Sequence, residues 1–190
     1  MSWLTVMGSA IGIAMQIILA IQIFKEKITQ NFTSWILWAI LEGIITASII
    51  SQQGSFLLPA TYSLGCVVVS VSIAIRLKIF LWTWFETMIA CLAIACMIIW
   101  SLSGAWVATI ASTSAVLIAG IPLAIDCYKH PRDNPFLIYS CFLIANVLAT
   151  AGARSWSVEE RLYPASCAAF TLLTIIFIGR KFFIKSRLGI

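Results

Sequence analysis

The chain has 190 residues, of which 62% are hydrophobic and 10% are charged, with a net charge of +5. This composition excludes a soluble globular domain, because too few polar side chains are present to cover a surface exposed to water. Short strands that alternate polar and apolar residues are absent, so a transmembrane β-barrel is not expected.

The hydrophobic residues are arranged in runs of about 20, the length that a helix needs to cross the hydrocarbon core of a bilayer. No basic residue precedes the first run and no small-residue cleavage site follows it, so we expect this run to stay in the mature protein. The sequence therefore predicts an all-α, multi-pass protein of the cell (inner or plasma) membrane. Its seven predicted spans are residues 3–24, 34–52, 55–76, 80–100, 104–126, 134–153 and 160–180.

The basic residues gather on one side of these spans. Only Arg154 and Arg161 fall on the other side, and the positive-inside rule then predicts an N-terminus outside and a cytoplasmic C-terminus. The positive charge is thus a topology signal, and no nucleic-acid partner is expected. The ten basic residues on the cytoplasmic side are Lys25, Lys27, Arg76, Lys78, Lys129, Arg132, Arg180, Lys181, Lys185 and Arg187.

An internal repeat relates the two ends of the chain. Residues 19–25 read LAIQIFK and residues 123–129 read LAIDCYK, and Pro59 corresponds to Pro164 at an offset one residue larger. Four crossings separate the first span from the fifth, so the two copies face the same way. We expect a 3+1+3 parallel repeat, with a first three-helix repeat in 1–78, a linker helix in 79–103, and a second repeat with a basic cytoplasmic tail in 104–190.

This layout resembles the SWEET-like superfamily, which includes SWEET and SemiSWEET sugar carriers, PQ-loop proteins and PnuC-type vitamin carriers. The resemblance rests on the 3+1+3 order, the paired prolines Pro59 and Pro164, and a basic-polar loop that leads to an aromatic second helix, from Lys25 to Trp38. The Pro-Gln pair that names the PQ-loop group is missing, since Gln16-Ile17 and Ile121-Pro122 stand in its place. The resemblance implies transport by alternating access.

One face of the second span carries aromatic and polar residues at helical spacing, and its repeat partners lie on the sixth span. Under twofold pseudosymmetry the two faces oppose each other across a solute path. The alternative for the outer aromatic pair is anchoring at the membrane interface, and for the inner pair it is core packing. The predicted substrate-binding pairs are Trp35 and Tyr139, Trp38 and Phe142, Glu42 and Asn146, and Thr46 and Thr150.

Glu42 lies near the middle of the membrane, where an ionised carboxylate costs several kcal/mol unless it is paired, hydrated or protonated. No Lys or Arg lies at the same depth, so we expect Glu42 to bind a cation or a proton in a wet cavity. The alternative is a neutral acid that is hydrogen-bonded to Asn146. Asn146 itself should face the bundle interior, as a binding residue or as a contact between helices.

Two smaller features complete the candidate set. Pro59 and Pro164 are candidate hinges, although proline is also tolerated near the start of a helix. Ser63, Cys66 and Ser70 form a stripe of small residues that favours close helix packing.

Nothing in the sequence indicates catalysis. The six cysteines form no CxxC pair, His130 is the only histidine, and the HExxH and GxSxG motifs are absent. We therefore expect no enzyme activity, no metal and no cofactor.

The sequence predicts a transporter that moves a small polar solute (sugar, vitamin-like or amine) between two three-helix bundles, proton-linked if Glu42 titrates. The alternative is a SWEET-like receptor or regulatory protein that binds a ligand without transporting it, and a channel is a third candidate. The expected partners are the solute and the lipid bilayer, and the formation of a homo-oligomer stays open.

Overall fold

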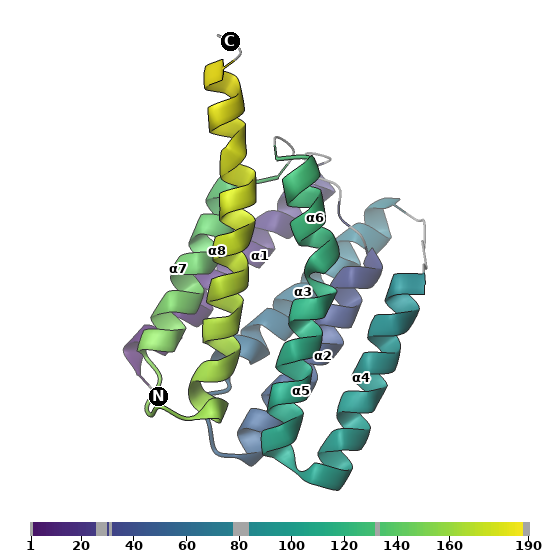
Figure 1. Cartoon of the computed structure of the whole chain (residues 1–190), viewed down its shortest axis with the longest axis vertical. Coiled ribbons are helices and arrows are strands. Elements are labelled where there is room, and N and C mark those ends of the chain that lie inside the picture. Colours follow the sequence, from purple (N-terminus) through teal and green to yellow (C-terminus); the bar gives the residue numbers. More distant parts are fainter. Residues whose placement is uncertain (1, 26–29, 31, 78–83, 132–133, 188–190) are drawn as a thin grey trace.

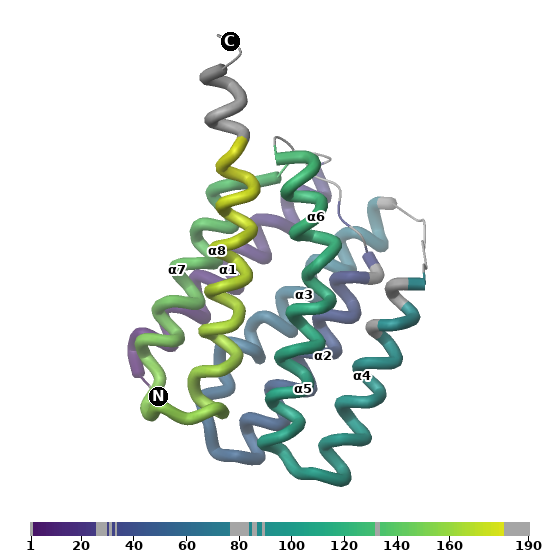
Figure 2. Tube along the Cα trace, in the orientation of Figure 1, coloured from purple at the N-terminus to yellow at the C-terminus, as the bar shows by residue number. Residues whose placement is uncertain are grey.

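The computed structural model describes residues 2–25, 30, 32–77, 84–131 and 134–187, and the side chains of 33, 77, 85, 86, 89 and 181–187 lie outside the description. Within these residues the chain forms eight α-helices and no strand, so the predicted all-α class is confirmed. Figures 1 and 2 show the helices side by side in a bundle, and in Figure 1 α1 begins at one end of the bundle and α8 ends at the other. They are α1 (Trp3–Phe24), α2 (Phe32–Ser51), α3 (Leu57–Leu77), α4 (Trp84–Ser103), α5 (Ala105–Ala119), α6 (Ile121–Lys129), α7 (Phe136–Ala151) and α8 (Val158–Arg187).

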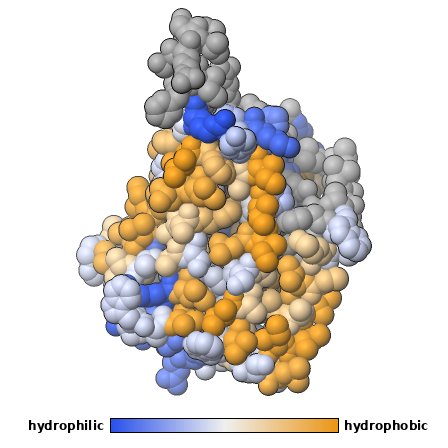
Figure 3. All heavy atoms as spheres, viewed as in Figure 1, coloured by the Kyte–Doolittle hydropathy of each residue, from blue (hydrophilic) through white to orange (hydrophobic). Residues whose placement is uncertain are grey.

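Five stretches are long and apolar enough to cross a bilayer, and they lie in α1, α2, α3, α5 with α6, and α8. Two shorter apolar stretches also occur: Ala90–Ser103 in α4 overlaps the fourth predicted span, and Phe136–Ala151 in α7 lies within the sixth. Large apolar side chains such as Leu64, Leu137 and Ile176 are exposed on the outside of the bundle. Figure 3 shows apolar side chains over much of the visible face. The chain therefore has the helices of a multi-pass membrane protein.

Helix α1 shows how the sequence selects its packing face. Its buried positions recur every three or four residues and include Gly8, Gly12 and Gln16, whereas Ile17 and Ile21 point outward. A Cβ atom at Gly8 would lie 2.5 Å from the backbone oxygen of Ala145. Glycine at this position therefore allows α1 and α7 to approach closely.

The helix contacts follow a simple pattern. Helix α3 packs against α1 and α2, and α8 packs against α5, α6 and α7. These two groups meet where α1 packs against α7 and where α2 packs against α5, while α4 contacts α5 and α2 from outside. Five buried polar side chains lie between the two groups, and they are Gln16, Glu42, Asn146, Thr171 and Thr174.

The fifth predicted span is two helices rather than one. Helix α5 ends at Ala119, and α6 begins at Ile121 after Gly120. Pro122 has no backbone N–H and cannot donate to the carbonyl of Ile118, so the ladder of helical hydrogen bonds is interrupted here. The neighbouring turn between α4 and α5 uses Gly104, whose φ of +83° favours glycine.

Candidate functional site

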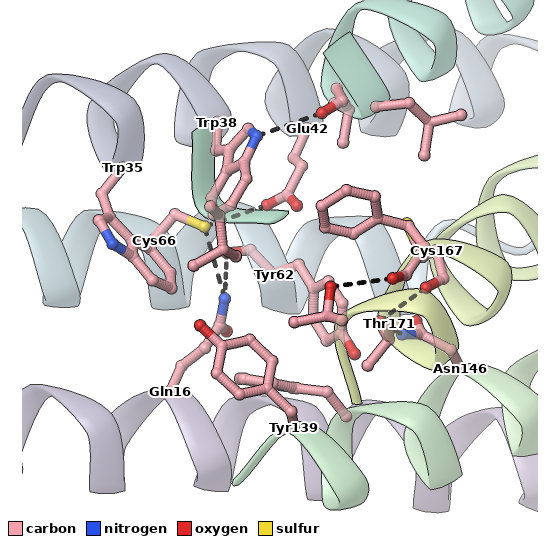
Figure 4. A pocket seen from close by; sticks show the side chains of 16 residues that line it. Gln16, Trp35, Trp38, Glu42, Tyr62, Cys66, Tyr139, Asn146, Cys167 and Thr171 are labelled. Carbon is pink, nitrogen blue, oxygen red and sulfur yellow. Dashed lines mark hydrogen bonds between the residues drawn. The ribbon is translucent and has the colours of Figure 1, made fainter. Parts of the chain in front are cut away.

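A pocket lies between the two helix groups, and its empty volume, including the opening, is about 640 Å³. Every helix except α4 contributes to its described lining. Figure 4 shows the polar and aromatic side chains that surround the space. The lining residues are Gln16, Trp35, Trp38, Glu42, Tyr62, Cys66, Val116, Leu117, Leu123, Tyr139, Phe142, Asn146, Cys167, Phe170, Thr171 and Thr174.

Glu42 is held where three helices meet. Its side chain is 5% exposed, and its carboxylate accepts hydrogen bonds from the Tyr163 hydroxyl of α8 at 3.1 Å and the Cys66 thiol of α3 at 3.4 Å. None of the sixteen lining residues is Lys, Arg or His, so the described pocket has no positive side chain to balance this carboxylate.

Asn146 lines the same pocket from α7 and is 1% exposed. Its amide nitrogen donates to the Thr171 hydroxyl at 3.4 Å, not to Glu42. The Tyr62 hydroxyl, which lines the same pocket, has no hydrogen-bond partner. The structure therefore brings Glu42 and Asn146 to one cavity without a direct bond between them.

Aromatic rings form much of the wall. The Trp35 and Trp38 rings meet edge to face with centroids 5.3 Å apart, and the Phe142 ring packs in the same way against Tyr139 and Tyr62, at 6.2 and 5.9 Å. The Trp38 indole N–H donates to the backbone oxygen of Val116 at 3.3 Å and so links α2 to α5. All four aromatic residues predicted from the repeat thus line the pocket.

Several buried polar atoms in the pocket have no hydrogen-bond partner. Seven such side-chain atoms occur in the described part of the chain, and four of them belong to pocket residues. A buried polar atom without a partner costs about 1–3 kcal/mol, so its presence calls for an explanation. A polar solute or ordered water in the pocket would satisfy these atoms. They are Gln16 Oε1, Tyr62 OH, Tyr139 OH and Asn146 Oδ1.

The other predicted residues lie outside the pocket lining. The hydroxyls of Thr46 and Thr150 donate to the backbone oxygens of Glu42 and Asn146, each at 2.7 Å, one turn further along their helices. Pro59 is the third residue of α3, where its missing N–H costs nothing, whereas Pro164 lies inside α8.

Sequence reasoning did not select several pocket residues. Gln16 was noted only as a position where the Pro-Gln pair is missing, and Cys66 was assigned to helix packing. A signal was nevertheless present, because the offset that pairs Pro59 with Pro164 also pairs Tyr62 with Cys167 and Cys66 with Thr171. Both members of each of these pairs line the pocket.

The described residues contain no group of three or more His, Cys, Asp or Glu side chains that could hold a metal ion. No family model, curated protein or solved structure matches the chain. Its function must therefore be argued from the pocket itself.

Proposed function

We propose that the chain is a membrane transporter that moves a small polar solute by alternating access of two three-helix bundles. The observation that carries this proposal is the pocket between the two helix groups, which contains four unpartnered polar atoms among aromatic rings. A site that is lined this way suits a solute with a ring and a few polar groups.

The proposed architecture has seven crossings, with α5 and α6 as one span and α4 as the linker. The opposite positions of the start of α1 and the end of α8 support an odd number of crossings (Figure 1). Lys25, Arg76, Lys129 and Arg180 follow or end the helices that run toward the α8 end, which favours this end as the cytoplasmic one. Among the other predicted cytoplasmic basic residues, Lys27, Lys78 and Arg132 lie outside the described residues, and so do the side chains of Lys181, Lys185 and Arg187.

The helix contacts support the parallel repeat. In each triplet the third helix packs against the first and the second, and the contact of α1 with α7 has its repeat equivalent in the contact of α5 with α2. Exchanging the two triplets therefore leaves the pattern of contacts unchanged, as a twofold pseudosymmetry axis requires.

A reciprocal exchange of large and small residues also supports the repeat. A Cβ atom at Gly65 would overlap the Gln16 side chain, and a Cβ atom at Gly120 would lie 2.5 Å from the Phe170 ring. Gly120 is the repeat counterpart of Gln16, and Phe170 is the counterpart of Gly65. Each triplet thus packs one large side chain over one glycine, with the roles reversed.

Hydrogen bonds join the two triplets at the end of the bundle where Ser2 lies. The Ser2 hydroxyl donates to the Gly152 backbone oxygen at 2.6 Å, and the Ser48 and Thr109 hydroxyls are 2.9 Å apart. Gly152 and Ser48 are repeat counterparts, so the two contacts lie at matching places in the two triplets, although their other partners, Ser2 and Thr109, are not counterparts. They support a state that is closed at this end, and rocking of the triplets would break both contacts together.

Uptake into liposomes that contain the purified protein tests the proposal. A panel of labelled sugars, nucleosides, vitamins and amines should yield at least one solute with saturable uptake, and Trp38→Ala and Asn146→Ala should abolish it. Flux that rises linearly with concentration would indicate a channel. Ligand-induced thermal stabilisation without flux of the same ligand would indicate a receptor and contradict the proposal.

Proton coupling is part of the proposal, through Glu42. The Glu42 carboxylate faces the pocket, and the other titratable groups around it are Cys66, Tyr62, Tyr163 and Cys167. Uptake driven by an imposed pH gradient should therefore disappear in Glu42→Gln while uptake down the solute gradient persists. Equal stimulation by the gradient in both proteins would contradict proton coupling and leave facilitated diffusion.

A further inference from the structure

Two of the four unpartnered polar atoms in the pocket are amide oxygens, which can only accept, and the other two are tyrosine hydroxyls, which can donate or accept. The Gln16 amide nitrogen donates to the Tyr62 backbone oxygen at 3.1 Å, and a backbone carbonyl can only accept, so the orientation of this amide is fixed. The Gln16 Oε1 atom is left without a partner.

The same argument fixes the Asn146 amide. The Thr171 hydroxyl donates its proton to the Cys167 backbone oxygen at 2.7 Å, so it can only accept from Asn146. The nitrogen of Asn146 must therefore face Thr171, and Oδ1 is the free atom. Two amide oxygens thus join the Glu42 carboxylate as acceptors, and the carboxylate has lone pairs beyond the two hydrogen bonds that it accepts.

The charge of the pocket also favours a cation. Glu42 is the only Asp or Glu among the lining residues, and none of them is Lys, Arg or His. A carboxylate in a largely apolar cavity is stabilised by a cation, and a second anion there would be repelled.

The aromatic wall suits a cation with an apolar body. Trp35, Trp38, Tyr139 and Phe142 all line the cavity, and the face of an aromatic ring attracts a cation within about 6 Å. Figure 4 shows the Glu42 carboxylate and the Trp38 and Tyr62 rings beside the same space.

We infer that the pocket binds a small organic ammonium ion with an aromatic or apolar body and without a carboxylate. The N–H groups of such an ion supply the donors that Glu42, Gln16 Oε1 and Asn146 Oδ1 require. A zwitterionic amino acid would bring a carboxylate for which the described pocket has no basic partner. This inference rests on the proposed function, since it names the class of solute that the pocket would carry.

Three probes with the same phenol ring separate the possibilities, because tyramine is a cation, tyrosol is neutral and tyrosine is a zwitterion. Calorimetry on the full chain in detergent should give a Kd for tyramine at least about tenfold lower than for the other two, a difference that corresponds to one well-placed polar or ionic interaction. Glu42→Gln should remove this preference, and Glu42→Asp, which keeps the charge, should retain it at weaker affinity.

Glu159→Gln is the matched control, because it makes the same chemical change in the first turn of α8, away from the pocket. Size-exclusion profiles of each variant establish that it is folded, and the Asp variant carries the test if the Gln variant does not fold. Equal affinity for tyrosol and tyramine, a preference that survives Glu42→Gln, or no tyramine binding would each overturn the inference.

Different experimental results would contradict this inference and the proposed function. Saturable uptake of a neutral solute with no tyramine preference would leave a transporter and remove the cation specificity. Tyramine binding as expected, without uptake into liposomes, would retain the ligand class and remove transport.

Discussion

At the scale of single residues, the repeat was the most productive signal in the sequence. It selected Trp35, Trp38, Glu42 and their three counterparts, all of which line one pocket. It could not exclude Thr46 and Thr150, because helical spacing gives the face of a residue but not the depth at which a cavity ends.

Gln16 lines the pocket but was not among the predicted site residues. A glutamine in an apolar span does not show by itself what it contacts, and the role of Gln16 depends on space left by Gly65 on another helix. Such a contact between distant residues has no local sequence signature. Only the reciprocal pair formed by Gly120 and Phe170 would have indicated it.

Gly65→Ala should destabilise the protein by about 1–3 kcal/mol, because the new methyl group overlaps the Gln16 side chain. Thermal unfolding in detergent measures the loss. Gln16→Ala in the same chain should restore most of the stability, since it removes the overlapping atoms. An additive loss in the double variant would show that the two side chains do not compete for this space.

Trp38→Phe should keep the aromatic wall but lose the hydrogen bond to the Val116 backbone oxygen, with a cost of about 1 kcal/mol. We expect a modestly lower melting temperature and preserved solute binding, whereas Trp38→Ala should lose binding as well. Equal binding by the Ala and Phe variants would contradict a role of the ring in the pocket.

At the scale of helices, hydropathy located the apolar stretches but not their interruptions. The break between α5 and α6 lies at Gly120, which leaves room for the Phe170 ring, and beside Pro122, which cannot continue the hydrogen-bond ladder. Neither effect changes the hydrophobicity of the segment, so a window over 104–126 reads as one continuous span.

The two prolines now have different structural settings and different expected effects. Pro164→Ala should restore a hydrogen bond to the carbonyl of Glu160 inside α8, raise the melting temperature and slow uptake if this helix bends during transport. Pro59→Ala, in the first turn of α3, should change both quantities little. Equal effects of the two substitutions on uptake would contradict this distinction.

At the scale of the whole molecule, the composition was enough to predict a helical membrane protein. The order of helices in space was not readable from composition, because lipid-facing and buried positions are both apolar. The proposed mechanism requires the hydrogen bonds between the triplets at the Ser2 end to break during transport, and the Ser48–Thr109 contact can be tested directly.

Cross-linking at this contact should arrest transport. In a chain without its native cysteines, Ser48→Cys with Thr109→Cys places two thiols where hydroxyls are 2.9 Å apart. Oxidation should reduce uptake to the level of protein-free liposomes, and a reductant should restore it. Each single-cysteine chain is the control, and unchanged uptake after complete cross-linking would show that this interface does not need to open.

Access to the pocket from each side of the membrane tests the transport mechanism most directly, and it does not require the solute to be known. Thr171→Cys in the cysteine-free chain puts a thiol in the pocket at a position whose repeat counterpart, Cys66, is already a cysteine. We predict that a membrane-impermeant thiol reagent modifies this residue both in right-side-out and in inside-out vesicles. Modification from one side only, under every condition tried, would contradict alternating access.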